Sequence, residues 1–258
     1  MGRRRAPRLT ALASAAVVAV GAVTGCSADA GEPGTAPDTP DAGVSASPAG
    51  GGEAGTPEPS GACAQRLVEP DEPIPGEVFA ECLVDATRVA QTSRYTTTYP
   101  DSSATGPLRM GDTFEVYLTA TDGAEVFIRD EQGWMKVPGG GWVEANAGGT
   151  PEQVMADAVV QAYLGFTDPR VQEQFFATTE WEPVTADPET VNGLQAIRYS
   201  GDPVFGEVTF DSYEIWIDDD YLPTRIVATV TMMGVTQTGQ QDYEDWGEPV
   251  EMPEAPPS

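Results

Sequence analysis

The sequence predicts an α+β domain in which a strongly curved antiparallel sheet, shaped like a half-barrel, wraps around helices. Two observations lead to this expectation. Segments with helical and with strand periodicity occur in separate blocks, in the order helix, strands, helices, strands, which is typical of segregated α+β folds. The strand segments alternate apolar and polar residues, as strands with one buried face do.

The first 25 residues have the layout of a secretory signal. Four arginines are followed by an uncharged run from Leu9 to Val23, which is shorter than the roughly 20 residues of a spanning helix. The run ends in "VTGC" (23–26), which resembles the bacterial lipobox, the site of thiol acylation. We therefore expect a lipoprotein signal peptide over 1–25 and an acyl anchor on Cys26. The alternatives are an ordinary cleaved signal and an uncleaved anchor.

The charge of the chain disfavours one class of partner. Loss of four arginines with the leader leaves nine basic residues against 41 acidic ones, a net charge of −32. We therefore expect no nucleic-acid partner. The same charge repels an anionic leaflet, so membrane contact would depend on the acyl anchor. The chain has no histidine, the commonest metal ligand and general base, and we expect no metal and no cofactor.

If Cys26 is acylated, two cysteines remain in an exported, oxidising compartment. We expect a disulfide between Cys63 and Cys82, which would join the start of the domain to its first helix. Two buried free thiols are the alternative. Residues 26–61 are rich in Ala, Gly, Pro and acidic residues, and they contain too little apolar surface to fold. We interpret them as a disordered tether, with one α+β domain over 62–258.

The first block of that domain combines one helix with a meander of strands. Residues 77–90 place apolar side chains at helical spacing. Alternating segments follow, and Asp122-Gly123 predicts a two-residue hairpin turn. The expected strands cover 93–99, 113–120, 125–130 and 134–137.

The second block begins with helices and ends with strands. Thr150, Pro151 and Gln153 predict a capped helix start, and that helix should stop at Gly165. A short helix should begin at Asp168-Pro169. The expected strands cover 194–200, 212–219, 223–233 and 235–246.

The last third of the chain carries a family resemblance. Its parts are "YEIWID" (213–218), the turn into "LPTRIV" (222–227) and the terminal "WGEPVEMPEAPP" (246–257), preceded by "ETVNGLQAIRYSGD" (189–202). With the lipobox, these resemble the LolA-like lipoproteins of actinobacteria, the LppX and LprG type. The resemblance implies a half-barrel over helices that encloses a hydrophobic cavity, and a role in binding or moving lipids or acylated glycolipids through the envelope.

The candidate cavity lining consists of apolar residues on the expected concave side of the sheet and on the long helix. Ordinary core packing is the alternative for each of them, because a core requires the same side chains. The candidates are Phe114, Val116, Leu118, Met155, Val159, Ile215, Ile217, Ile226 and Val230.

Other motifs are weaker. "DDD" (218–220) lacks the ligand spacing of a calcium loop and favours an acidic hairpin turn. Trp134, Trp142 and Trp216 would suit either a glycan platform or plugs at sheet edges. No catalytic residue is assigned, because the only lysine is Lys136 and no carboxylate pair stands out.

The expected protein is therefore a non-enzymatic lipoprotein, anchored to the outer face of the cytoplasmic membrane, that binds a lipid or another amphiphile. An envelope protein would be a further partner. One alternative is an interaction or sensor lipoprotein with a closed core. The other is a wall hydrolase that depends on paired carboxylates.

Overall fold

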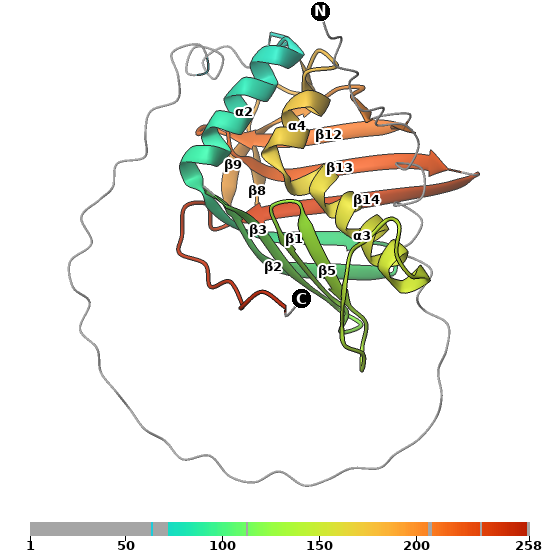
Figure 1. The fold of residues 1–258 in the computed structure, drawn as a ribbon. Helices are drawn as coiled ribbons and strands as arrows, with labels where there is room; N and C mark the ends of the chain where they lie inside the picture. Colours follow the sequence, from blue (N-terminus) through green and yellow to red (C-terminus); the bar gives the residue numbers. More distant parts are fainter. Residues whose placement is uncertain (1–62, 64–71, 112, 206–207, 233, 257–258) are drawn as a thin grey trace, which may run out of the picture.

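A computed structural model describes residue 63 and residues 72–111, 113–205, 208–232 and 234–256 (Figure 1). The expected leader and tether, including Cys26, lie outside the described residues. Among the described helices, none is long and apolar enough to cross a membrane.

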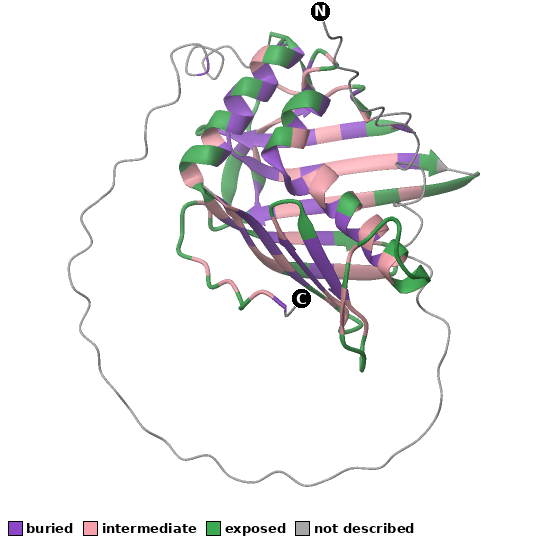
Figure 2. Cartoon of the chain, viewed as in Figure 1, coloured by how far each residue is buried: buried purple, intermediate pink, exposed green. Residues whose placement is uncertain are grey.

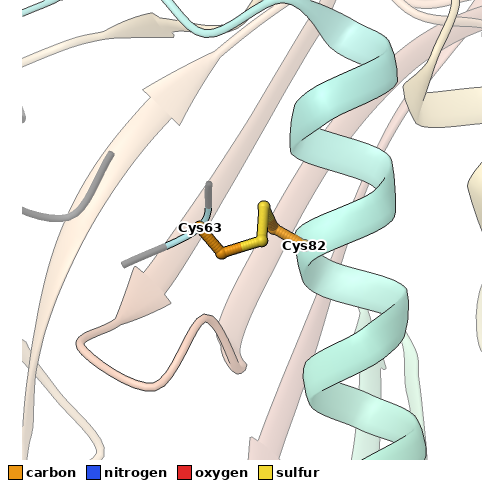
Figure 3. Close-up of a disulfide and its surroundings, with 2 residues drawn as sticks. All are labelled: Cys63 and Cys82. Carbon is orange, nitrogen blue, oxygen red and sulfur yellow. A yellow bond between two sulfur atoms is a disulfide. The ribbon is translucent and has the colours of Figure 1, made fainter. Parts of the chain in front are cut away.

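The first helix, α2 (Gly76–Ala90), buries one face, with Phe79 and Leu83 fully inaccessible to solvent. Cys82 lies on the same helix and forms a disulfide with Cys63, as the sequence predicts (Figure 3). The helix ends at Gln91, which adopts a left-handed conformation with φ of 64° and donates its backbone N–H to the carbonyl of Thr87. The disulfide therefore joins the beginning of the described chain to the helix.

A meander of six strands follows α2, and each strand pairs antiparallel with the next. Strands β1, β3, β4 and β5 agree with the segments predicted from the sequence, whereas β2 and the short β6 were not predicted. The strands are β1 (Thr92–Tyr99), β2 (Ser102–Met110), β3 (Phe114–Ala120), β4 (Glu125–Arg129), β5 (Gln132–Lys136) and β6 (Trp142–Glu144).

Strand β2 contains Gly106 and Pro107, which together favour a loop in sequence analysis. The pairing of β2 with β3 is interrupted there, since it runs to Thr105 and resumes at Leu108. Proline lacks the N–H that a ladder requires. A Cβ on Gly106 would lie only 1.9 Å from the carbonyl oxygen of Tyr117, so the close approach of the strands requires glycine. The strand forms despite these residues because β1 pairs along nearly its whole length and β3 pairs on both sides of the interruption.

Two helices connect the halves of the sheet. Helix α3 (Pro151–Thr167) begins with the predicted capping box, in which the Thr150 hydroxyl accepts from the Gln153 N–H and the Gln153 side chain accepts from the Thr150 N–H. It continues for two residues beyond the predicted end at Gly165. Helix α4 (Pro169–Phe176) is capped by Asp168, whose carboxylate accepts from the Arg170 N–H at 2.9 Å.

The second half of the sheet follows α4. The predicted strands are β9 (Leu194–Ser200), β12 (Ser212–Asp218), β13 (Pro223–Met232) and β14 (Val235–Glu244). Four short strands were not predicted, and each spans two or three residues. They are β7 (Glu182–Pro183), β8 (Glu189–Val191), β10 (Val204–Phe205) and β11 (Val208–Thr209). Two of them, β10 and β11, form a separate two-stranded sheet.

The main sheet has 12 strands in the order β6-β5-β4-β3-β2-β1-β14-β13-β12-β9-β7, with β8 paired to β9. The strand pairs are antiparallel, and the first half joins the second where β1 pairs with β14. In Figure 1, β1–β5 turn away from β12–β14, and the helices α2, α3 and α4 lie across one face. The predicted α+β class and the open, curved antiparallel sheet are therefore confirmed.

The core lies between the sheet and the helices, and Figure 2 shows buried segments of both facing one another. Its densest part is aromatic. Phe79 of α2 stacks on Trp181 with ring centroids 4.6 Å apart, and Phe176 of α4 meets both rings edge-on. The Trp181 indole N–H donates to the Phe176 carbonyl at 3.0 Å, so its polar group is satisfied inside the core.

Candidate ligand-binding pocket

An apolar pocket lies between α3 and the concave side of the first half of the sheet. Its volume is about 80 Å³. Side chains from β1 to β5 and the segments that join these strands form most of the wall, and Val159 and Tyr163 of α3 cover it. The full lining is Thr97, Tyr99, Ser102, Ser103, Ala104, Leu118, Ala120, Asp122, Ala124, Val126, Met135, Val137, Pro138, Val159 and Tyr163.

Helix α3 packs closely on the sheet at Gly133 of β5. The two methyl groups of Val160 lie over Gly133 of β5, where a Cβ would come within 2.4 Å of each methyl carbon. Val159 and Tyr163, four residues apart, share the helix face that covers the pocket. The contact with Gly133 therefore sets the distance between the helix and the pocket floor.

The pocket is apolar at its floor and polar at one end. Tyr99 and Ser102 lie at the ends of β1 and β2, and Asp122 lies in the turn between β3 and β4. The Asp122 carboxylate accepts from the Ala124 N–H at 2.9 Å. The Ala120 N–H donates to the Ala124 carbonyl, so the loop has three residues, and Gly123 takes φ of 85°. The predicted two-residue turn was wrong by one residue, because the glycine occupies the left-handed position of a longer loop.

The tyrosines of this region are shielded from water. Burial raises the pKa of Tyr163 well above its usual value, and Tyr99 and the Asp122 carboxylate raise it further. Burial also raises the pKa of Tyr99, which a hydrogen bond with Thr97 partly offsets. Both hydroxyls therefore stay protonated at physiological pH and are available as hydrogen-bond donors.

The structure brings two of the nine candidate lining residues to the pocket, Leu118 and Val159. Met155 is half-buried and packs against the core. The other six are buried outside the pocket, and all but Val230 belong to the main core cluster. They are Phe114, Val116, Ile215, Ile217, Ile226 and Val230.

The polar residues of the pocket were not among the candidates predicted from the sequence. Thr97 and Tyr99 alternate with outward-facing residues of β1, so their inward orientation follows from the strand pattern once β1 is placed. The sequence pattern at Asp122 predicted only a turn and gave no indication that this residue lines a pocket. Ala104 lies on β2, the strand that Gly106 and Pro107 obscured, and no pattern in the sequence indicated its position.

The opposite face of the sheet holds a second, open hollow of about 410 Å³, lined by Arg109, Gly111, Thr113, Glu115 and Arg129. Glu115 is buried and accepts from Arg109 at 2.7 Å and from Arg129 at 2.7 Å. The two guanidinium groups satisfy this carboxylate, so the cluster binds β2, β3 and β4 together.

The weaker motifs have structural settings. Asp218 is buried, and one of its carboxylate oxygens accepts the N–H groups of Asp220 and Leu222, so the acidic segment forms a hairpin turn, as predicted. No group of residues suited to hold a metal ion occurs in the described part of the chain. Trp134 and Trp216 are buried, Trp142 is half-buried, and none forms an exposed platform.

Comparisons with known proteins give structural similarity only. No family model matches the chain, and no curated protein matches its sequence. A DUF1329 family protein from Desulfovibrio piger is 11% identical, with TM-score 0.33 and coverage of 66% of this chain and 90% of that one. The MucA/MucB complex of Pseudomonas aeruginosa is 18% identical, with TM-score 0.39 and coverage of 68% of this chain and 59% of that one. This chain therefore spans about three fifths of that matched protein. The LolA superfamily protein NE2245 from Nitrosomonas europaea is 11% identical, with TM-score 0.28 and coverage of 70% of this chain and 96% of that one.

Proposed function

We propose that this protein is a non-enzymatic, lipid-anchored binding protein that takes the apolar part of a lipid or another amphiphile into the pocket under α3. The observation that supports the proposal is the lining of this pocket, which is apolar at the floor and polar at one end. An amphiphile has the same division, and ligand pockets combine apolar walls with a few placed polar groups. The resemblance of the sequence to LolA-like lipoproteins agrees with this assignment.

The volume of the pocket restricts the proposal. About 80 Å³ is well below the roughly 300 to 1,000 Å³ of pockets for drug-sized ligands. A whole acyl chain therefore fits only if α3 moves away from the sheet. The helix is suited to such a movement, because its outer face is solvated, with Val154 42% exposed, and two of its side chains cover the pocket.

The location that we propose is the outer face of the cytoplasmic membrane, with an acyl anchor on Cys26 and residues 26–61 as tether. Two acyl chains on the sulfur bury enough methylene groups for stable anchoring, at about 0.8 kcal/mol each. Cys26→Ser should leave the protein unacylated, and mass spectrometry of the membrane fraction detects the change. An unmodified Cys26 in the native protein would overturn the anchor.

Ligand binding can be tested with a neutral apolar reporter, N-phenyl-1-naphthylamine, on protein that carries Cys26→Ser. We expect saturable fluorescence enhancement. Ala104→Leu places a larger side chain at the pocket floor, where Ala104 is 6% exposed, and should weaken reporter binding at least about tenfold. The same change at the exposed Ala147 is the matched control and should leave binding unchanged.

A second candidate follows from the small volume. A protein whose interior is nearly filled would serve as an interaction or sensor lipoprotein, with an envelope protein as its partner. Native mass spectrometry distinguishes the two, since a carrier should co-purify with lipid. A ligand-free protein that also gives no reporter signal would exclude the carrier and favour the closed-core alternative.

A further inference from the structure

The pocket lining contains one acidic residue and no basic residue. Asp122 lies at its polar end, among the hydroxyl groups of Tyr99, Ser102, Ser103 and Tyr163. One oxygen of Asp122 accepts from the Ala124 N–H, and no cation pairs with this carboxylate among the described residues. The fixed charge at the polar end of the pocket is therefore negative.

Basic residues elsewhere in the described chain are already engaged. Each of the eight forms an ion pair with a carboxylate, so none is left to neutralise a ligand. Lys136 lies in the chain between the lining residues Met135 and Val137, and it pairs with Glu125 at 2.7 Å and lies over the ring of Trp142. The others are Arg88, Arg94, Arg109, Arg129, Arg170, Arg198 and Arg225.

The influence of Asp122 extends into the pocket. Its carboxylate is one of the groups that raise the pKa of Tyr163, the residue of α3 that covers the cavity. A charge near a partly dehydrated site interacts more strongly with a ligand charge than it does in bulk water. An anionic head group at the polar end of the pocket would be repelled by the unpaired carboxylate of Asp122. A hydroxylated head group could instead form hydrogen bonds with the hydroxyl groups there.

We propose that the pocket selects its amphiphile by the charge of the head group: it takes uncharged, hydroxylated heads and cationic heads, and it excludes anionic ones. This inference rests on the proposed function, because it assumes that the apolar part of the ligand enters under α3. Asp122 is the residue that discriminates, by repulsion of an anion and not by a specific contact with the preferred ligand.

Three ligands with the same eight-carbon chain test the proposal: octyl β-glucoside, octyltrimethylammonium and octyl sulfate. Their affinities for the protein with Cys26→Ser are measured by calorimetry at low ionic strength, below the micellar concentrations. We expect the glucoside and the ammonium compound to bind at least about tenfold more tightly than the sulfate.

Asp122→Asn removes the charge and keeps the side-chain oxygen that accepts from the Ala124 N–H. It should strengthen sulfate binding about three- to tenfold, weaken ammonium binding by a similar factor and leave the glucoside unchanged. Asp187→Asn alters the net charge equally at an exposed residue outside the pocket, and should change none of the three affinities.

The outcomes separate this inference from the function on which it rests. Equal affinities for the three ligands, or equal effects of the two substitutions, would overturn charge selection while the pocket remained a binding site. Failure of all three ligands and of the neutral reporter to bind would overturn the proposed function together with the selection.

Discussion

Val160 of α3 packs against Gly133 of β5 so closely that a Cβ at Gly133 would lie within 2.4 Å of both Val160 methyl carbons. Valine is branched at Cβ and has little rotamer freedom in a helix, so its methyl groups cannot move aside without displacement of the backbone. The pair therefore fixes how closely the helix approaches the sheet, and with it the volume of the pocket.

Gly133→Ala should lower the free energy of unfolding by about 1 to 3 kcal/mol, because overpacking forces the helix and the strand apart. Denaturant unfolding measures the loss. The double substitution with Val160→Ala should be less destabilised than the sum of the single ones, since the smaller side chain removes the clash. Gly141→Ala, where no atom lies within 4 Å of the added Cβ, is the control and should change stability by less than about 0.5 kcal/mol. If the effects of the two single substitutions simply add in the double variant, the close contact between Gly133 and Val160 is contradicted.

The disulfide between Cys63 and Cys82 should contribute to stability chiefly by restricting the unfolded chain. Its two cysteines are 19 residues apart, and a loop of this length corresponds to about 3 kcal/mol. Replacement of both cysteines by alanine should lower the midpoint of urea unfolding accordingly. Reductant should reproduce the loss in the parent protein and have no effect on the variant. An unchanged midpoint would show that the disulfide does not stabilise the protein by restricting the unfolded chain.

The sequence predicted the longer elements because their apolar residues follow a clear period and their ends carry capping signals. Helix α3 is an example, since Thr150 and Gln153 form the capping box that their spacing indicates. Strand β2 was missed because Gly106 and Pro107 are the strongest local signals in it, and its place in the sheet is determined by pairing with β1 and β3. Local patterns do not contain that information.

The pocket was harder to predict than the fold. Periodicity correctly assigned Phe114 and Leu118 to one face of β3, yet Leu118 lines the pocket and Phe114 does not. Which part of a buried face stays unfilled depends on where and how closely α3 packs against the sheet, as it does at Val160 and Gly133. No local pattern in the sequence indicates this tertiary contact.

Glu115 should stabilise the first half of the sheet through its two arginine partners. Its side chain is 5% exposed, whereas those of Arg109 and Arg129 are 39% and 41% exposed. Glu115→Gln leaves two neighbouring positive charges with a weaker acceptor, and should cost about 2 kcal/mol in unfolding free energy. Glu131→Gln, at an exposed residue nearby in the chain, should cost less than about 0.5 kcal/mol. Equal effects of the two changes would argue that solvent screens the buried cluster completely.

Asp218 should make stability depend on pH. Burial, the largest effect, raises the pKa of its carboxyl to about 6, although the N–H groups of Leu222 and Asp220 oppose the change. The pKa in the unfolded chain is lower, about 3.9. The stability that the protonated group contributes is therefore fully present below about pH 4 and is lost as the pH rises through 6.

Asp218→Asn tests this dependence because the amide keeps an oxygen for the two N–H donors and cannot ionise. The variant and the parent should be similarly stable at pH 4, and at pH 7.5 the variant should be more stable by about 2 to 3 kcal/mol. Urea unfolding at several pH values measures the difference in unfolding free energy between variant and parent. The contributions of the other titrating groups cancel in this difference, because both proteins contain them. Asp187→Asn, at an exposed residue outside this turn, is the control and should not reproduce the gain at pH 7.5. A difference between Asp218→Asn and the parent that stays constant from pH 4 to 7.5 would mean that folding does not raise the pKa of Asp218.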